Sequence, residues 1–132
     1  MRIMIDTNVL ISALLFPSEK MNELFKIITS NHTMVLPSYV VDELYKVIER
    51  KFPTKIQVIE DLLSRMSYEL VYTPKTIKKQ LIEIRDKSDY PVIHTAIVEG
   101  VDILITVDND FQDLEIEKPE ILTPNDFLEK YK

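Results

Sequence analysis

Short apolar segments alternate with amphipathic segments along this chain, and this alternation limits the fold more than any other feature of the sequence. Each strand-like segment is rich in Ile, Val and Leu, and most are followed by apolar residues at helical spacing. Because parallel strands need such crossovers between them, the order predicts an α/β fold, a three-layer α/β/α arrangement around a mostly parallel sheet of four or five strands. The expected strands are residues 2–5, 33–36, 69–71, 102–106 and a short one at 120–122.

Prolines and small polar residues mark where the expected helices begin and end. Ser38 is a good N-cap for a helix that starts after Pro37, and Pro91 stands just inside the start of another helix, which Gly100 ends. Apolar stripes predict two earlier helices, around residues 9–14 and 24–28. Three further helices are expected to open at Pro53, at Pro74 and at Pro124-Asn125, the last continuing over residues 126–131.

Length and composition are those of one folded unit. The 132 residues fit a single domain over 1–132, which can bury a core without a disulfide or a structural metal. The absence of cysteine excludes thiolate zinc sites and redox motifs, and the single glycine excludes the glycine-rich loops that cradle nucleotide phosphates. The chain starts with a strand rather than a signal peptide and has no membrane-spanning run, so we expect a cytoplasmic protein with no membrane partner.

Four acidic residues lie where an open α/β sheet would bring them together. Asp6 ends the first strand, Asp108 follows a later strand, and Glu43 and Asp89 lie near helix starts. In such a sheet the carboxyl ends of the strands and the adjoining helix starts share one crevice. Ionised carboxylates about 4–5 Å apart repel one another by roughly 3–4 kcal/mol per pair at an effective dielectric near 20. The cluster therefore calls for protons or a cation, and an all-oxygen ligand set favours Mg2+ or Mn2+.

Asp6 and Glu43 also have structural interpretations. Asp6 could cap the helix that follows it, but the run of three polar residues Asp6-Thr7-Asn8 exceeds what a cap needs. Glu43 favours its helix dipole, yet its spacing puts it on the edge of the buried face, whereas Asp42 points to solvent. Both Asp6 and Glu43 are therefore interpreted as functional.

The later acids are less clear-cut. Either Asp89 or Ser88 could be the N-cap of the Pro91 helix, and a capping role for Asp89 is compatible with metal binding because that helix start faces the crevice. Asp110 could either cap the turn at 111–114 or bind the metal. Asp102 stands at the beginning of its strand, at the wrong end for the site, and is interpreted as structural.

The charge balance counts only weakly against a nucleic-acid substrate. The net charge is −6, whereas general nucleic-acid binders are usually basic. Several of the acids would, however, lie opposite a bound cation, and the basic residues are clustered in two stretches of the chain. Lys46, Arg50 and Lys87 are candidate contacts to flanking phosphates. The alternative interpretation of both clusters is a solvated helix face.

Five segments of the chain carry a family resemblance. They are residues 4–15, 41–44, 86–93, 103–111 and 121–128, which read MIDTNVLISALL, VDEL, DKSDYPVI, ILITVDNDF and ILTPNDFL. In this order they resemble PIN domains, and specifically the single-domain forms grouped as toxins of toxin–antitoxin systems. The resemblance spans nearly the whole chain. Two positions depart from the family pattern: Tyr90 stands where many relatives carry another acid, and Val107 where a small or basic residue is frequent.

The resemblance implies a PIN-like fold and a metal-dependent endoribonuclease with the four acids as its catalytic and metal-binding centre. One or two metal ions would activate a water and offset charge on the scissile phosphate, so no nucleophilic side chain is needed. Asp110 is a further candidate ligand, and we expect Asn8 and Thr106 to orient carboxylates and waters.

The resemblance also implies an RNA substrate and an antitoxin protein as partner, with a homodimer as a weaker expectation. Two other functions stay open. A phosphatase with an Asp nucleophile usually carries a second Asp two residues on, and here that position is Asn8, which counts against this chemistry. The other is a PIN-like module that binds RNA or a protein without cleaving.

Overall fold

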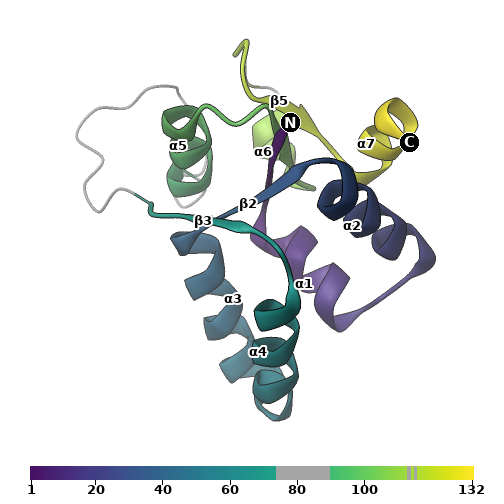
Figure 1. Cartoon of the computed structure of the whole chain (residues 1–132). Coiled ribbons are helices and arrows are strands. Elements are labelled where there is room, and N and C mark those ends of the chain that lie inside the picture. Colours follow the sequence, from purple (N-terminus) through teal and green to yellow (C-terminus); the bar gives the residue numbers. More distant parts are fainter. Residues whose placement is uncertain (74–89, 113, 115) are drawn as a thin grey trace.

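The computed structural model describes residues 1–73, 90–112, 114 and 116–132. Strands and helices alternate along these residues, as the sequence predicts (Figure 1). The strands are β1 (Arg2–Ile5), β2 (Thr33–Pro37), β3 (Glu69–Val71), β4 (Ile103–Ile105) and β5 (Glu120–Leu122). The helices are α1 (Thr7–Leu15), α2 (Glu19–Asn31), α3 (Ser38–Lys51), α4 (Ile56–Arg65), α5 (Tyr90–Glu99), α6 (Asn109–Gln112) and α7 (Pro124–Tyr131), with a 3-10 turn η1 (Pro53–Lys55) before α4.

The five described strands form one parallel sheet in the order β3-β2-β1-β4-β5. β1 lies at the centre, where Ile3 pairs with Met34 of β2 on one side and with Ile103 of β4 on the other. Helices flank the sheet on both faces (Figure 1), so the predicted three-layer α/β/α fold is confirmed. Because the strands run in the same direction, the residues that follow β1, β2 and β4 reach one edge of the sheet.

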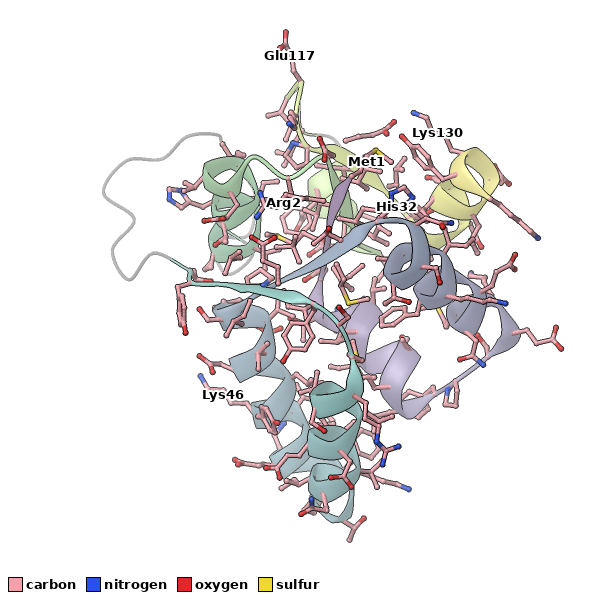
Figure 2. The ribbon with its side chains drawn as sticks, viewed as in Figure 1. Met1, Arg2, His32, Lys46, Glu117 and Lys130 are labelled. Carbon is pink, nitrogen blue, oxygen red and sulfur yellow. The ribbon has the colours of Figure 1, made fainter. Side chains whose placement is uncertain are left out.

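The opposite edge of the sheet holds the start of the chain. The amino group of Met1 lies 3.3 Å from Nδ1 of His32, and the side chain of Arg2 extends to α5, where it donates to the carbonyl oxygen of Glu99 (Figure 2). The two edges therefore carry different groups, and the candidate site lies at the carboxyl edge.

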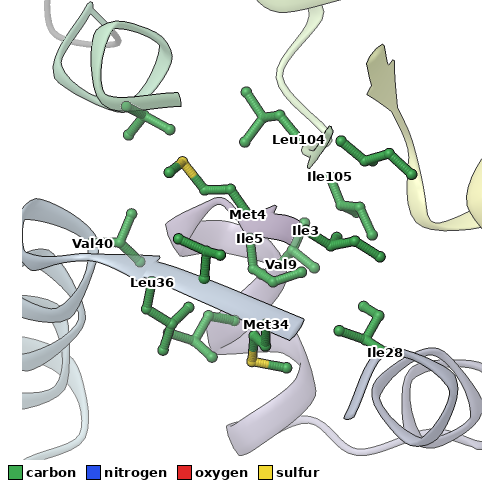
Figure 3. Packing of buried hydrophobic residues seen from close by; sticks show 14 of the residues in the cluster. Ile3, Met4, Ile5, Val9, Ile28, Met34, Leu36, Val40, Leu104 and Ile105 are labelled. Carbon is green, nitrogen blue, oxygen red and sulfur yellow. The ribbon is translucent and has the colours of Figure 1, made fainter. Parts of the chain in front are cut away.

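The central strands are buried on both faces, which explains why they are continuous apolar runs. Ile3, Met4 and Ile5 of β1 are fully buried, and the residues of β4 are at most 1% exposed. Figure 3 shows the side chain of Met4 extending toward α5, whereas Ile28 of α2 lies on the other side of β1. The hydrophobic core therefore lies on both faces of the sheet, with β1 at its centre.

Two strands end differently from the prediction. β2 continues one residue further than expected, to Pro37, and β4 covers only Ile103–Ile105 instead of residues 102–106. The amide of Thr106 still donates to the carbonyl oxygen of Leu122 at 3.0 Å, but the chain then turns toward α6. Thr106 therefore keeps a ladder hydrogen bond without continuing the strand.

The predicted N-cap of α3 is wrong. Pro37 occupies the cap position without a side-chain hydrogen bond, and Ser38 is the first helical residue. The Ser38 hydroxyl instead accepts from the amide of Thr73 at 2.9 Å, and the hydroxyl of Thr73 accepts from the amide of Tyr39 at 3.2 Å. The group that satisfies the first turn of α3 thus comes from the residues after β3, which local sequence cannot reveal.

Other helix starts follow the sequence more closely. Pro91 is the second residue of α5, and Gly100 ends that helix with φ 63°, a value that favours glycine. Pro53 opens the turn η1 rather than a regular helix, so α4 begins only at Ile56. Pro124 is the first residue of α7, as predicted, and Thr123 caps that helix. The helix predicted to open at Pro74 lies outside the described residues.

Helix length and composition also bear on membranes. Along the described segments, none of the helices is both long and apolar enough to span a lipid bilayer.

Candidate functional site

Asp6 is the most buried of the described acids of the candidate site. It directly follows the central strand β1 and caps α1, and only 9% of its surface is exposed. Its Oδ1 atom accepts from the amide of Thr7 at 2.7 Å, and its Oδ2 atom accepts from the hydroxyl of Thr106 at 2.7 Å. The cap and the functional interpretation therefore coexist, because the carboxylate is held at both oxygens while it remains at the edge of the sheet.

Thr106 connects the ends of β1 and β4. It is fully buried, and its hydroxyl also accepts from the amide of Asp108 at 3.0 Å. The Oδ1 atom of Asp108 in turn accepts from the amide of Asp110 at 2.9 Å. Asp108 is therefore the residue that caps α6, a role that the sequence analysis had weighed for Asp110. Asp110 lies in the first turn of that helix, half-buried.

Glu43 reaches the same region from α3. The buried residues of that helix are Val40, Leu44 and Ile48, and Glu43 is half-buried at the edge of their stripe. Asp42 is exposed, as predicted. Because α3 packs against α1, whose first turn carries the Asp6 cap, Glu43 is brought near Asp6 from an element 37 residues further along the chain.

Asp6, Glu43 and Asp108 interact electrostatically. Burial raises the pKa of Asp6, the hydrogen bonds from Thr106 and Thr7 oppose that rise, and the negative charges of Glu43 and Asp108 add to it. Burial and like charge thus both disfavour the ionised form of Asp6. A cation beside Asp6 would reverse both effects, because it would replace the lost solvation and offset the neighbouring charges.

The donor set fits a hard divalent ion, since the candidate ligands offer only carboxylate oxygens. Within residues 1–73, 90–112, 114 and 116–132, however, no three acidic or histidine side chains converge closely enough to hold an ion between them. The fourth predicted acid, Asp89, lies outside the described residues. The described residues therefore supply one preorganised carboxylate, Asp6, with Glu43 and Asp108 within electrostatic reach.

The remaining predicted residues lie around this centre. Asn8 is exposed in the first turn of α1, and it is Thr106 that fixes the orientation of Asp6. Lys46 and Arg50 are exposed on α3, and Figure 2 shows Lys46 on the outer side of that helix. Lys87 lies outside the described residues.

The local sequence pattern does not indicate the position of Thr7 beside Asp6. Its amide donates to Asp6, and its own hydroxyl is buried without a hydrogen-bond partner among the described residues. The polar run of residues 6–8 was the available signal, but that run was interpreted through Asp6 and Asn8. Burial of Thr7 depends on how α1 packs, and this information is absent from the local pattern.

Comparisons with known proteins agree with this architecture. The profile of the PIN domain family matches residues 2–110 of the chain. A chain from the crystal structure of VapBC2 from Rickettsia felis, bound to a DNA fragment from their promoter, superposes with a TM-score of 0.68. That chain shares 20% sequence identity, and the alignment covers 92% of this chain and 97% of the other. A search of curated proteins gives no significant match.

Proposed function

Because this chain belongs to the PIN domain family, whose members are generally nucleases, we propose that it is a metal-dependent endoribonuclease that hydrolyses RNA phosphodiester bonds at the carboxyl edge of its sheet. The main support for the proposal is the environment of the Asp6 carboxylate. A carboxylate that is buried at the end of the central strand, held at both oxygens and surrounded by two further negative charges is costly to the fold. Such a cost is characteristic of functional sites.

A divalent ion bound at this edge would supply a Lewis acid that lowers the pKa of a water and offsets charge on the phosphate. Asp6, Glu43, Asp89 and Asp108 would hold it, with Asp110 as a further candidate ligand. The chain's own contribution is orientation, because Asp6 is already fixed by Thr106 before any ion or substrate arrives. No nucleophilic side chain is required, since water is the attacking group.

Flanking phosphates of the substrate would meet α3. Lys46 and Arg50 are exposed, and they follow Glu43 at spacings of three and seven residues, which place all three side chains on one side of that helix. A phosphate chain that enters the acidic edge beside Glu43 could therefore continue along two cations. Lys87 is a third candidate contact. Binding of this kind depends strongly on salt and weakly on sequence.

We further propose that the protein is the toxin of a toxin–antitoxin pair. The support is the similarity in fold to a chain of the VapBC2 structure, together with the single-domain resemblance in sequence. The expected partner is an antitoxin whose Arg or Lys side chains pair with the acidic edge and compete with metal and phosphate. A cytoplasmic location and a homodimer accompany this proposal as expectations.

The two rival functions make different demands on the site. An Asp-dependent phosphatase would need an acid two residues after Asp6, and the exposed amide of Asn8 stands there. A non-cleaving PIN-like module would bind RNA without needing the buried carboxylate. A non-cleaving module does not account for a carboxylate held at both oxygens beside two negative charges.

The experiment that tests the proposal is cleavage of single-stranded RNA by the purified protein in Mn2+, with and without EDTA. Glu43→Gln should remove most of the activity because it neutralises a proposed ligand without changing the side-chain shape. Asp42→Asn is the matched control, since Asp42 is the exposed neighbour on the same helix, and it should cleave like the wild type. RNA binding without cleavage in any divalent metal would favour the non-cleaving module. Cleavage that survives EDTA would contradict the metal requirement.

A further inference from the structure

A concave surface lies next to the acidic edge. It is a groove of about 510 Å³ between α1, the start of α2, the turn after β4 and the start of α7. Two of its walls adjoin the proposed ligands in sequence, since Val107 immediately precedes Asp108 and Val9 lies three residues after Asp6. A molecule bound at the acidic edge would therefore extend directly into this groove.

The lining of the groove has the charge that a polyanion requires. None of the described residues that form it is acidic, although the whole chain carries a net charge of −6. Its one charged residue is Lys20, in the first turn of α2, and hydroxyl and amide side chains such as Ser12 and Asn125 accompany it. Both α2 and α7 begin at this groove, and each carries one acid in its first turn, Glu19 and Asp126, that is not among the lining residues.

An exposed aromatic ring stands in the groove. Phe16 follows α1 and is 59% exposed, which is unusual for the largest apolar side chain type in this protein. Its ring meets that of Phe52 with centroids 5.8 Å apart and planes at 74°. This edge-to-face contact holds Phe16 and covers at most one of its faces, so another flat ring can stack on it.

We propose that this groove binds the nucleobase of an RNA nucleotide next to the scissile phosphate, with Phe16 as the stacking surface and Lys20 as the contact to the adjoining phosphate. The inference rests on the proposed ribonuclease function and names the part of the substrate that the groove takes. Stacking on an aromatic side chain tolerates every base, because each base has a π face. The groove would therefore set the position of the strand rather than select one sequence.

The stacking role is tested by binding of a short fluorescein-labelled single-stranded RNA in EDTA, which prevents cleavage. Phe16→Leu keeps an apolar side chain against Phe52 but removes the π face, and Phe16→Trp keeps an aromatic face. We expect Phe16→Leu to bind about tenfold more weakly, because one lost base–aromatic contact has this order of effect, and Phe16→Trp to bind like the wild type. Val58→Ala, on α4 outside the groove and also exposed, is the control and should have no effect.

The phosphate contact is tested by the salt dependence of the same binding. Lys20→Gln should reduce the slope of log Kd against log salt concentration by about 1, because one fewer counterion is released from the RNA. Lys26→Gln is the matched control on α2, since Lys26 is exposed on the same helix but does not line the groove. Its slope should equal that of the wild type.

The outcomes of these experiments distinguish failure of the groove assignment from failure of the ribonuclease proposal. If the wild-type protein neither binds nor cleaves RNA, the ribonuclease proposal itself fails. If it cleaves RNA while Phe16→Leu and Lys20→Gln bind and cleave like the wild type, only the groove assignment is overturned. If those variants instead lose binding to a co-expressed protein partner with RNA affinity unchanged, the groove is a protein-docking surface and the base-stacking inference is wrong.

Discussion

The two edges of the sheet use acidic residues in opposite ways. At the amino edge the acids are paired with cations. The guanidinium of Arg2 donates from Nε to Glu69 at 3.1 Å and from Nη2 to the same carboxylate at 2.7 Å, and Asp102 accepts from the amide of Arg2 at 2.8 Å. Lys118 lies 3.3 Å from Asp102. The pKa of Asp102 is held low by the amide hydrogen bond and by Lys118.

At the carboxyl edge the pattern is reversed. Among the described residues, the charges that act on Asp6 are those of Glu43 and Asp108, and both are negative. The hydrogen bonds from Thr7 and Thr106 offset only part of the cost of burial, so the pKa of Asp6 is raised where that of Asp102 is lowered. Ionised acids therefore stabilise the fold at one edge and oppose it at the other. We propose that a bound cation offsets this cost at the carboxyl edge.

The largest expected effect comes from exchanging a carboxylate for an amide at each edge. Asp6→Asn should abolish RNA cleavage and raise the thermal midpoint of the metal-free protein, because it removes a buried charge from among like charges. Asp102→Asn should leave cleavage intact and lower the midpoint, because it weakens two favourable contacts. Cleavage assays in Mn2+ and thermal unfolding in EDTA measure both. The proposed contrast between the edges is wrong if Asp102→Asn loses cleavage activity or if Asp6→Asn keeps it.

A smaller effect is expected when the support of Asp6 is removed instead of its charge. Thr106→Val deletes the hydroxyl that holds Oδ2, and loss of a group that orients a metal ligand typically costs about 10–100-fold in activity or metal affinity. Thr106→Ser should restore most of the activity, since it restores the hydroxyl. Thr95→Val is the buried control, because the Thr95 hydroxyl donates to the carbonyl oxygen of Pro91 at 2.6 Å within its own helix. If Thr95→Val loses as much activity as Thr106→Val, the loss reflects general damage to the core.

The smallest effect is a difference in pH dependence between the edges. The folded pKa of Asp6 is raised above its unfolded value, so ionisation of Asp6 destabilises the fold as the pH rises from the unfolded pKa through the folded one. The stability advantage of Asp6→Asn over the wild type should therefore grow as the pH rises above the unfolded pKa, about 4, and level off once the pH exceeds the folded pKa. Thermal unfolding of both proteins in EDTA across this range measures it.

Asp102 should behave in the opposite sense. Its folded pKa is lowered, so its stabilising contribution is present above the unfolded pKa and is lost as the pH falls through the folded one. The loss of stability that Asp102→Asn causes, relative to the wild type, should accordingly become smaller as the pH falls. Parallel curves for the two variants would show that the edges do not differ electrostatically.

Much of the fold follows from local pattern. The bounds of β1, β3 and β5 agree with the predicted ranges because short apolar runs between polar turns encode buried strands directly. Gly100 ends α5 as predicted, because a residue with φ 63° is needed there. The choice of Ser38 as a cap was wrong for a nonlocal reason, since its partner is Thr73, 35 residues away.

For the candidate site, the sequence likewise indicates the residues but not their arrangement. Asp6, Glu43 and Asp108 stand out in sequence because an acid next to a strand end or on the edge of an apolar helical stripe is conspicuous. Their mutual arrangement is not encoded locally. The hydrogen bond between Thr106 and Asp6 joins residues 100 positions apart, and it exists because β4 pairs with β1. That Asp108 rather than Asp110 caps α6 also depends on where the strand ends.

The sequence by itself determined the class of fold and the family, because hydrophobic periodicity and residue type are properties of short segments. The tertiary structure decided which strands are neighbours, which carboxylate is buried and held, and that Phe16 and Lys20 line a groove beside it. These features depend on how distant segments pack in three dimensions. The burial that raises the pKa of Asp6 arises only when α1, β1 and β4 have come together.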